Sequence, residues 1–237
     1  MPLLTPRVLT PVAAAVLLAL AGLLALAGLL ACQSEPLAGA GEDPSLPQAP
    51  RDDCEARTVV YADSLGCDGL VYPHPDSSPY RLPFPPGVEI RTGLTNCSSS
   101  FHGADRPDRY AFDFDFPTGT PFYAARGGEV VRVVEDQLSG GGDGPGNYLV
   151  VDHGDDTYGL YYHSPNGGID VAVGDRVAQG DRLGEVGRSG YAGYPHLHFV
   201  VTRGGWRWPY RPLPVSFANA YPPDVKLRGR ATYEACE

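Results

Sequence analysis

Two histidines separated by a single residue lie in the segment Tyr194–Phe199, which reads Tyr-Pro-His-Leu-His-Phe. Successive side chains of a β-strand point to opposite faces, so His196 and His198 are predicted to share one face while Leu197 points to the other. Imidazole is a common zinc ligand, and it also carries protons near neutral pH. The pair therefore predicts two metal ligands, or one ligand and one proton carrier, and further ligands must come from elsewhere in the chain.

A second segment supplies carboxylates. Residues Tyr110–Phe116 alternate strictly, which predicts a strand with four aromatic side chains on one face. Burial of each aromatic ring is worth roughly 1.5–3 kcal/mol, which gives this strand a reason to form. Asp113 and Asp115 lie on the opposite face, where each is either solvated or a candidate ligand.

The histidines available as partners are few. The chain contains six: His74, His102, His153, His163, His196 and His198. Pro73 and Pro75 flank His74 and disfavour regular structure there, so His74 is predicted to be an exposed loop residue.

Composition favours a mostly β architecture. Of the 237 residues, 30 are glycine and 24 proline, which suits short strands and turns, and no segment after residue 32 shows a convincing helical pattern. We expect a compact antiparallel sandwich or barrel-like core with few or no helices. The formal charge of −10 argues against a nucleic-acid partner. The predicted strands cover residues 88–91, 110–116, 122–125, 129–134, 148–152 and 158–163, with shorter ones within 171–186.

Residues 1–32 are predicted to be a targeting segment. An apolar run ends in Leu29-Leu30-Ala31-Cys32, which resembles the lipobox of bacterial lipoproteins. That resemblance implies cleavage before Cys32, lipidation of its thiol and attachment to a membrane. Gln33 in the next position favours the periplasmic face of an outer membrane. The alternative is an uncleaved anchor helix, since the run is long enough to span a bilayer.

The remainder of the chain divides into four parts. Residues 33–50 are rich in Pro, Gly and Ala and are predicted to be a flexible tether. Residues 51–81 form a small disulfide-bearing extension, 82–220 the main domain and 221–237 a C-terminal tail. Four cysteines besides Cys32 allow three pairings, and we favour a local Cys54–Cys67 bond and a Cys97–Cys236 bond that ties the tail back.

From about Leu82 to Phe217 the chain resembles the LytM or lysostaphin-type zinc endopeptidases, which cleave peptide bonds in bacterial peptidoglycan. The resemblance rests on seven motifs in the order of that family. They are His102 with Tyr110–Phe114, Gly119–Pro121, Val151–Gly154, Tyr161–His163, Val177–Gly180, Gly187–Gly190 and Pro195–Phe199.

The resemblance implies a role for each site residue. It assigns the Zn²⁺ ligands to His102, Asp113 and His198, a set that leaves a fourth tetrahedral position open for water. It places His163 and His196 beside that water and the scissile carbonyl. We hypothesise His196 as the general base and His163 as the oxyanion donor, and the reverse assignment stays open. The expected substrate is a peptidoglycan peptide, and the expected state is a monomer.

Several positions depart from the family pattern. Asp115 is the second choice as ligand, or a partner of Asp113. His153 lies beside a turn and is predicted to be structural. Tyr194 stands where the family usually has glycine, Ser164 replaces a common leucine and Val200 a common glutamate. These three replacements bear on substrate preference.

Other functions fit less well. A non-catalytic LytM-like module that binds and activates another cell-wall hydrolase resembles this fold, but such modules have lost zinc ligands that this chain keeps. A biotinyl or lipoyl carrier needs a lysine at a hairpin tip, whereas the only lysine, Lys226, lies in the predicted tail. A purely structural wall-binding lipoprotein would not need imidazoles matched to a carboxylate.

Overall fold

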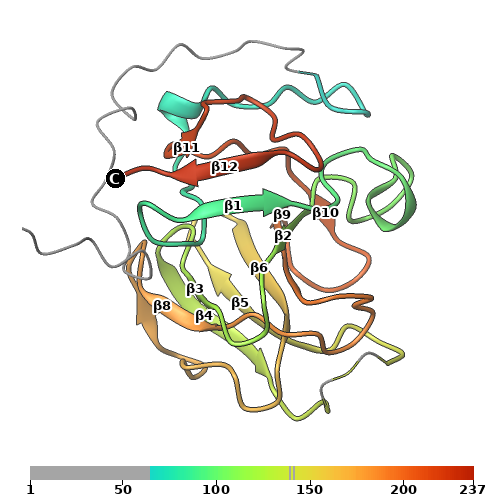
Figure 1. Ribbon diagram of the computed structural model, residues 1–237, viewed down its shortest axis with the longest axis vertical. Helices are drawn as coiled ribbons and strands as arrows, with labels where there is room; N and C mark the ends of the chain where they lie inside the picture. The colour runs from blue at the N-terminus through green and yellow to red at the C-terminus, as the bar shows by residue number, and fades with distance from the viewer. Residues whose placement is uncertain (1–64, 139, 141) are drawn as a thin grey trace, which may run out of the picture. The chain divides into compact units, whose positions relative to one another are not determined.

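The computed structural model describes residues 65–138, 140 and 142–237 (Figure 1). Within these ranges the regular secondary structure is β apart from two short 3-10 turns, η2 (Pro75–Ser77) and η3 (Ser100–His102), and there is no α-helix, which confirms the predicted fold class. None of these residues forms a helix suited in length and hydropathy to crossing a bilayer. The predicted targeting segment, the tether and the first part of the extension lie outside the described residues.

The strands follow the predicted ranges closely, and three that were not predicted occur near the C-terminus. In chain order they are β1 (Glu89–Thr92), β2 (Phe112–Asp115), β3 (Pro121–Tyr123), β4 (Gly128–Val134), β5 (Asn147–Asp152), β6 (Thr157–Ser164), β7 (Arg176–Val177), β8 (Arg182–Glu185), β9 (His196–Arg203), β10 (Arg211–Pro212), β11 (Ala220–Tyr221) and β12 (Thr232–Ala235).

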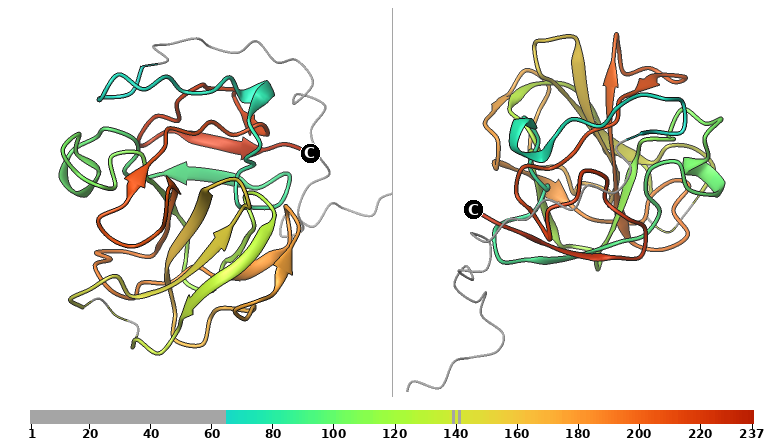
Figure 2. Two further views of the ribbon diagram at one scale, coloured as in Figure 1. Left: turned by 180° about the vertical axis from the view of Figure 1, so that it is seen from behind. Right: turned by 90° about the horizontal axis from the view of Figure 1, so that it is seen from above.

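Most strands belong to one antiparallel sheet with the order β11-β12-β1-β2-β9-β6-β5-β4-β7, and β10 also pairs with β9. Strands β3 and β8 form a separate two-stranded sheet, which Figures 1 and 2 show beside the larger one. Strand β9 therefore has β2 on one side and β6 on the other. These three neighbours, far apart in the chain, carry most of the candidate site.

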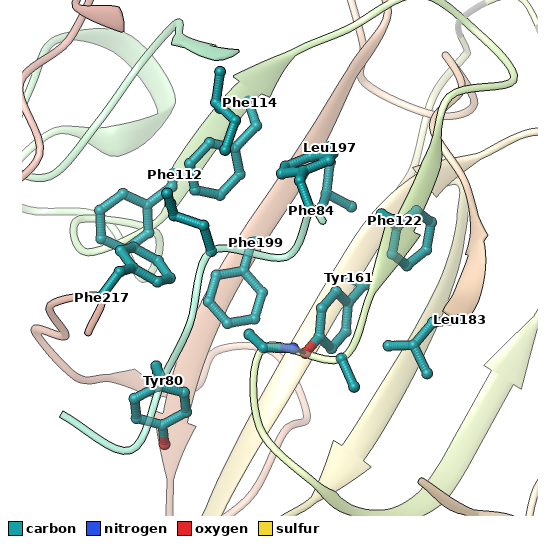
Figure 3. Close-up of a cluster of buried hydrophobic side chains, with 14 of the residues drawn as sticks. Tyr80, Phe84, Phe112, Phe114, Phe122, Tyr161, Leu183, Leu197, Phe199 and Phe217 are labelled. Atoms are coloured by element: carbon teal, nitrogen blue, oxygen red, sulfur yellow. Dashed lines mark hydrogen bonds between the residues drawn. The ribbon is translucent and has the colours of Figure 1, made fainter. Parts of the chain in front are cut away.

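The main core lies between the two sheets (Figure 3). Phe122 on β3 and Leu183 on β8 meet side chains of the larger sheet there, among them Leu197 and Phe199 of β9. Val200 belongs instead to a second cluster, with Val150, Leu160, Ala111 and Tyr210. The predicted alternation along β9 is thus confirmed, because Leu197 and Phe199 face the main core whereas His198 and Val200 face the other way.

The aromatic strand is shorter than predicted. Phe112 and Phe114 are fully buried in the main core, and Phe116 packs against it. Tyr110 precedes β2 and lies in a separate cluster with Tyr72 and Val225. The prediction of four aromatic rings on one face is therefore wrong for Tyr110, because a residue outside the strand does not follow its alternation.

Both predicted disulfides are wrong. Cys67 is bonded to Cys97, and Cys236 is also disulfide-bonded. The preference for a Cys54–Cys67 bond rested on their closeness in the chain. The structure instead joins the extension to the loop that precedes η3.

The segment predicted as a C-terminal tail contributes to the main sheet. Strand β12 pairs with β1 along three residue pairs, and Tyr233 and Ala235 belong to the main core. The extension is also partly buried, since the side chains of Tyr72 and Tyr80 are 3% and 4% exposed. Both ends of the described chain therefore pack against the domain.

Candidate metal centre

Strand register brings the chemistry-bearing residues together. Asp113 on β2 lies opposite His198 on β9, and Asp115 lies opposite His196. On the other side of β9, His198 lies opposite Tyr162 of β6. Opposing residues of an antiparallel pair point to the same face and are close neighbours, so the polar face of all three strands is continuous here.

His102 reaches this face from outside the sheet. It is the last residue of η3, is 1% exposed, and places its Nε2 3.3 Å from Asp113 Oδ1. The loop before η3 is fixed to the region around β2 by backbone hydrogen bonds, from Asp113 to Leu94 and from Cys97 to Arg109. These bonds hold His102 against β2, although it lies far in sequence from the other histidines of the centre.

His163 turns toward the centre through an unusual backbone conformation. A regular β6 would point Tyr162 and His163 to opposite faces. His163 has φ of 78°, in the left-handed region, and both rings pack near His198, at centroid distances of 5.5 and 5.7 Å. Left-handed backbone is uncommon for residues other than glycine, and it concentrates at functional sites.

Three imidazole nitrogens converge on one carboxylate oxygen, Asp113 Oδ1. His198 Nδ1 lies at 3.0 Å, His102 Nε2 at 3.3 Å and His196 Nε2 at 3.5 Å. The rings of His163 and His196 are adjacent, with centroids 4.7 Å apart. All five residues are at most 8% exposed.

The hydrogen bonds of two rings fix their neutral tautomers. His163 Nδ1 lies 2.8 Å from the Ser189 carbonyl oxygen, and His196 Nδ1 lies 2.9 Å from that of Tyr194. A carbonyl oxygen only accepts, so each Nδ1 carries the proton. When these rings are neutral, each Nε2 is therefore an unprotonated nitrogen.

Burial keeps both of these rings neutral. Desolvation, together with the nearby His198 and His196 rings, lowers the pKa of His163 to about 3. Desolvation also lowers the pKa of His196, against the opposing effect of Asp113. Each ring is thus neutral in a largely dry site, with an unprotonated Nε2 that can accept a hydrogen bond.

The carboxylate and its facing imidazole show the opposite behaviour. Burial alone would raise the pKa of Asp113, but hydrogen bonds from His102 and His198 outweigh it and lower that pKa. Burial disfavours charge on His198, yet the carboxylates of Asp108 and Asp113 raise its pKa to about 10. The centre is therefore organised around a fixed negative charge.

This donor set fits a metal ion. The unprotonated Nε2 of His196 and the Asp113 carboxylate face each other at 3.5 Å, and two electron-rich atoms are held at that distance most favourably by a cation. Two overlapping groups have ligand atoms within 4.8 Å of one another: His102, Asp113 and His198, and His163, His196 and His198. The first group is the ligand set that the motifs predicted, and the second contains both predicted catalytic histidines.

Two other predicted candidates lie elsewhere. Asp115 belongs to neither group and accepts a 2.5 Å hydrogen bond from Arg91 of β1. His153 Nδ1 donates to the Gly127 carbonyl oxygen at 2.9 Å, and its ring packs against Tyr80. Both arrangements are structural contacts.

The structure adds Asp108, which sequence reasoning missed, and shows what Tyr194 contacts. Asp108 Oδ1 lies 3.4 Å from His198 Nε2 and also accepts a hydrogen bond from the Tyr210 hydroxyl. Tyr194 stacks on His196 with ring centroids 4.7 Å apart. The exchange of glycine for Tyr194 was a visible signal, but nothing in the loop around Asp108 distinguishes it from a solvated aspartate.

Comparison with known proteins identifies the domain. Residues 108–209 match the model of Peptidase family M23. The match includes Asp113, His163, His196 and His198, whereas His102 lies just before it.

Curated relatives match over a similar length of chain. The peptidoglycan DD-endopeptidase ShyA of Vibrio cholerae is 36% identical over 93 residues, which are 39% of this chain and 20% of the relative. The glycyl-glycine endopeptidase ALE-1 of Staphylococcus capitis is 32% identical over 97 residues, 41% of this chain and 25% of the relative. The chain thus spans a quarter or less of the length of these relatives.

Among solved structures, the catalytic domain of a mutant of the prophage-encoded M23 protein EnpA from Enterococcus faecalis is 25% identical. The alignment covers 56% of this chain and 93% of that domain, with a TM-score of 0.44. Residues 108–209 of this chain thus match Peptidase family M23, and the order of the motifs and the two endopeptidase relatives agree with that match.

Proposed function

We propose that this protein is a zinc-dependent endopeptidase that hydrolyses peptide bonds in peptidoglycan cross-links or stem peptides. The observation that carries the proposal is the convergence of His102 Nε2, Asp113 Oδ1 and His198 Nδ1, with two neutral imidazoles beside them. The relatives named as peptidoglycan DD-endopeptidase and glycyl-glycine endopeptidase support peptidoglycan peptides as the substrate class.

His102, Asp113 and His198 are the residues that would hold the ion. A bound Zn²⁺ would supply Lewis acidity, which lowers the pKa of water and polarises a carbonyl group. Two imidazoles and one carboxylate are a donor set typical of catalytic rather than structural zinc sites. Their burial excludes bulk water from the place where charge develops.

His196 is assigned the first proton transfer. Its Nε2 is free of protons and faces the carboxylate of Asp113, so it can accept a proton from the attacking water and return it to the departing amine. The Tyr194 carbonyl oxygen holds the ring in this tautomer. Asp113 stabilises the imidazolium that results.

His163 is assigned to the carbonyl oxygen of the scissile bond. Its neutral tautomer has no proton on Nε2, because Nδ1–H is used on the Ser189 carbonyl oxygen. It can therefore donate to that oxygen only in its protonated form, with a proton taken up from solvent before the bond is cleaved. This requirement separates its role from that of His196.

We also propose that the domain works as a monomer while attached to a membrane through lipidated Cys32. The lipobox-like sequence at Leu29–Cys32 and the composition of residues 33–50 support this proposal, and Gln33 favours the periplasmic face of an outer membrane. Metabolic labelling with a clickable fatty acid tests it. Label should attach to the wild-type chain and not to Cys32→Ser.

Activity is tested with the purified full chain and isolated peptidoglycan. We expect about one zinc per chain by elemental analysis and new amino termini in the digest by mass spectrometry. Activity should be lost on chelation and restored by added zinc. A chain that binds zinc but releases no new termini, alone or with an added wall hydrolase, would contradict the proposal.

Two variants separate metal binding from proton transfer. His196→Ala and His163→Ala should each keep zinc and lose cleavage by roughly 10²–10⁴-fold, the usual contribution of a general acid or base. His74→Asn, which changes the half-buried histidine at the N-cap of η2 and lies in neither ligand group, is the matched control and should retain both properties. Loss of zinc from His196→Ala would assign His196 as a ligand instead. If the wild type stimulates a second hydrolase without cleaving by itself, the non-catalytic activator is the better description.

A further inference from the structure

The second nitrogen of His198 has a partner that the family motifs do not include. His198 Nδ1 points to Asp113, and its Nε2 lies 3.4 Å from Oδ1 of Asp108. Asp108 lies in the loop between η3 and β2, and its side chain is 15% exposed. Each edge of the His198 ring is thus faced by a separate carboxylate.

Asp108 is itself held in place. The hydroxyl of Tyr210 donates a hydrogen bond to the same Oδ1, and Tyr210 is only 8% exposed. The Asp108 carbonyl oxygen also accepts a hydrogen bond from Ala111 N at 2.9 Å, which fixes the backbone. Tyr210 immediately precedes β10, which pairs with β9, so both sides of this contact are anchored to the strand that carries His198.

The packing leaves His198 little freedom to rotate. The ring of Tyr162 packs edge-on against it at 5.5 Å, and the ring of His102 does so at 5.1 Å. A ring held this way presents its two nitrogens in fixed directions. Which nitrogen carries the proton therefore decides which one can bind a metal.

A carboxylate accepts hydrogen bonds and cannot donate them while ionised. When His198 is neutral with a metal bound, a proton on Nε2 satisfies Asp108 and leaves the lone pair of Nδ1 directed toward Asp113. The opposite tautomer would place a lone pair against the Asp108 carboxylate. Asp108 therefore selects the form of His198 that can be a ligand.

We propose that Asp108, supported by the hydroxyl of Tyr210, is a positioning residue that fixes His198 as an Nδ1 metal ligand. This inference rests on the proposed metal centre and adds to it a pair that the motifs do not contain. Asp108 is the first residue of the M23 match, and Tyr210 lies one residue beyond its end. Partners of this kind orient ligating imidazoles and raise their basicity.

The first test measures zinc affinity without substrate, using the full chain, zinc alone as probe and a chromophoric chelator as competitor. Asp108→Asn should weaken zinc binding by about 10- to 100-fold, the usual effect of removing such a partner. Tyr210→Phe removes the hydroxyl that donates to Asp108 and also contacts Tyr162, and it should weaken zinc binding by about threefold to tenfold. Asp115→Asn is the matched control, since Asp115 pairs with Arg91, and its affinity should stay within about twofold of wild type.

The second test needs no variant. Nitrogen-15 spectra of the zinc-bound wild-type chain should show His198 with a proton on Nε2 and none on Nδ1. A proton on Nδ1, or an unchanged zinc affinity in folded Asp108→Asn, would overturn the inference. Because neither test involves cleavage, a chain that passes both but cuts no peptide would refute the proposed function and leave the role of Asp108 intact.

Discussion

Strands β2 and β9 are buried on both faces, but the two faces are held by different forces. On one face Phe112, Phe114, Leu197 and Phe199 pack into the main core, with no solvent exposure. On the other, Asp113, His196 and His198 are nearly as buried. The apolar face gains free energy by leaving water, whereas the polar face loses it unless each group finds a partner of matching charge or hydrogen-bonding type.

The two faces therefore differ in how much substitution they tolerate. Apolar side chains need only the right face and size, so their packing tolerates some substitution. The polar face depends on single atoms, such as the carbonyl oxygens that set the tautomers of His163 and His196. Damage to the first face should therefore appear as lost stability, and damage to the second as lost binding and activity.

Neighbouring residues on β9 give the largest expected contrast. His198→Gln should abolish zinc binding and reduce cleavage about a thousandfold or more, because the metal contributes several kcal/mol to the reaction. Leu197→Ala should instead cost about 2–5 kcal/mol of unfolding free energy, because it leaves a cavity in the main core. Zinc analysis and urea unfolding of both variants make the comparison. If folded Leu197→Ala fails to bind zinc, the two faces are not separable.

Two carboxylates on the same face of β2 give the next contrast. Asp113→Asn should lose zinc and activity, whereas Asp115→Asn should keep both and cost about 0–1 kcal/mol of stability. Asp115 pairs with Arg91, whose side chain is 57% exposed, and such pairs contribute little. Zinc content and thermal unfolding distinguish the variants. Equal loss of metal from both would make Asp115 a ligand.

The smallest expected effect is on the pH dependence of the unfolding free energy, and it concerns His153, a partly buried histidine outside the metal centre. Burial lowers the pKa of His153, against the opposing effects of the Gly127 hydrogen bond, Asp155 and Asp152, while Arg126 lowers it further. The unfolded chain has a histidine pKa of about 6.5, so below that pH it binds more protons than the folded chain, and stability falls as the pH drops toward the folded pKa.

His153→Gln should remove this contribution and make unfolding free energy less dependent on pH below about 6.5. Urea unfolding at several pH values, with chelator present for both proteins, provides the measurement. A steeper pH dependence in the variant would show that His153 is charged in the folded protein. Zinc binding at neutral pH should be unaffected.

The sequence predicted the apolar face more completely than the polar one. Alternation along residues 112–116 and 196–199 is local, so the facing of Phe112, Leu197 and Phe199 followed from pattern alone. The resemblance carried by the seven motifs also predicted His102, Asp113 and His198 as one ligand set. The short strands beyond residue 210 were missed because their pairing partners lie far away in the chain.

Other features depend on contacts that no local pattern encodes. The inward turn of His163 needs a left-handed backbone at the end of β6, which a strand pattern does not predict. The contact between Asp108 and Tyr210 joins residues 102 positions apart. The Cys67–Cys97 bond was not predicted for a related reason. Closeness in sequence is a weak guide to which cysteines meet in space.

The pairing of β12 with β1 has a consequence for molecules that lack β12. Strand β1 lies between β12 and β2, so residues 232–235 cover the edge of β1 next to the carboxylates of β2. A molecule ending before Thr232 would leave the backbone of β1 as an open edge, prone to unintended pairing. Molecules clipped before Thr232 should therefore associate through the open backbone of β1 more readily than molecules that keep β12.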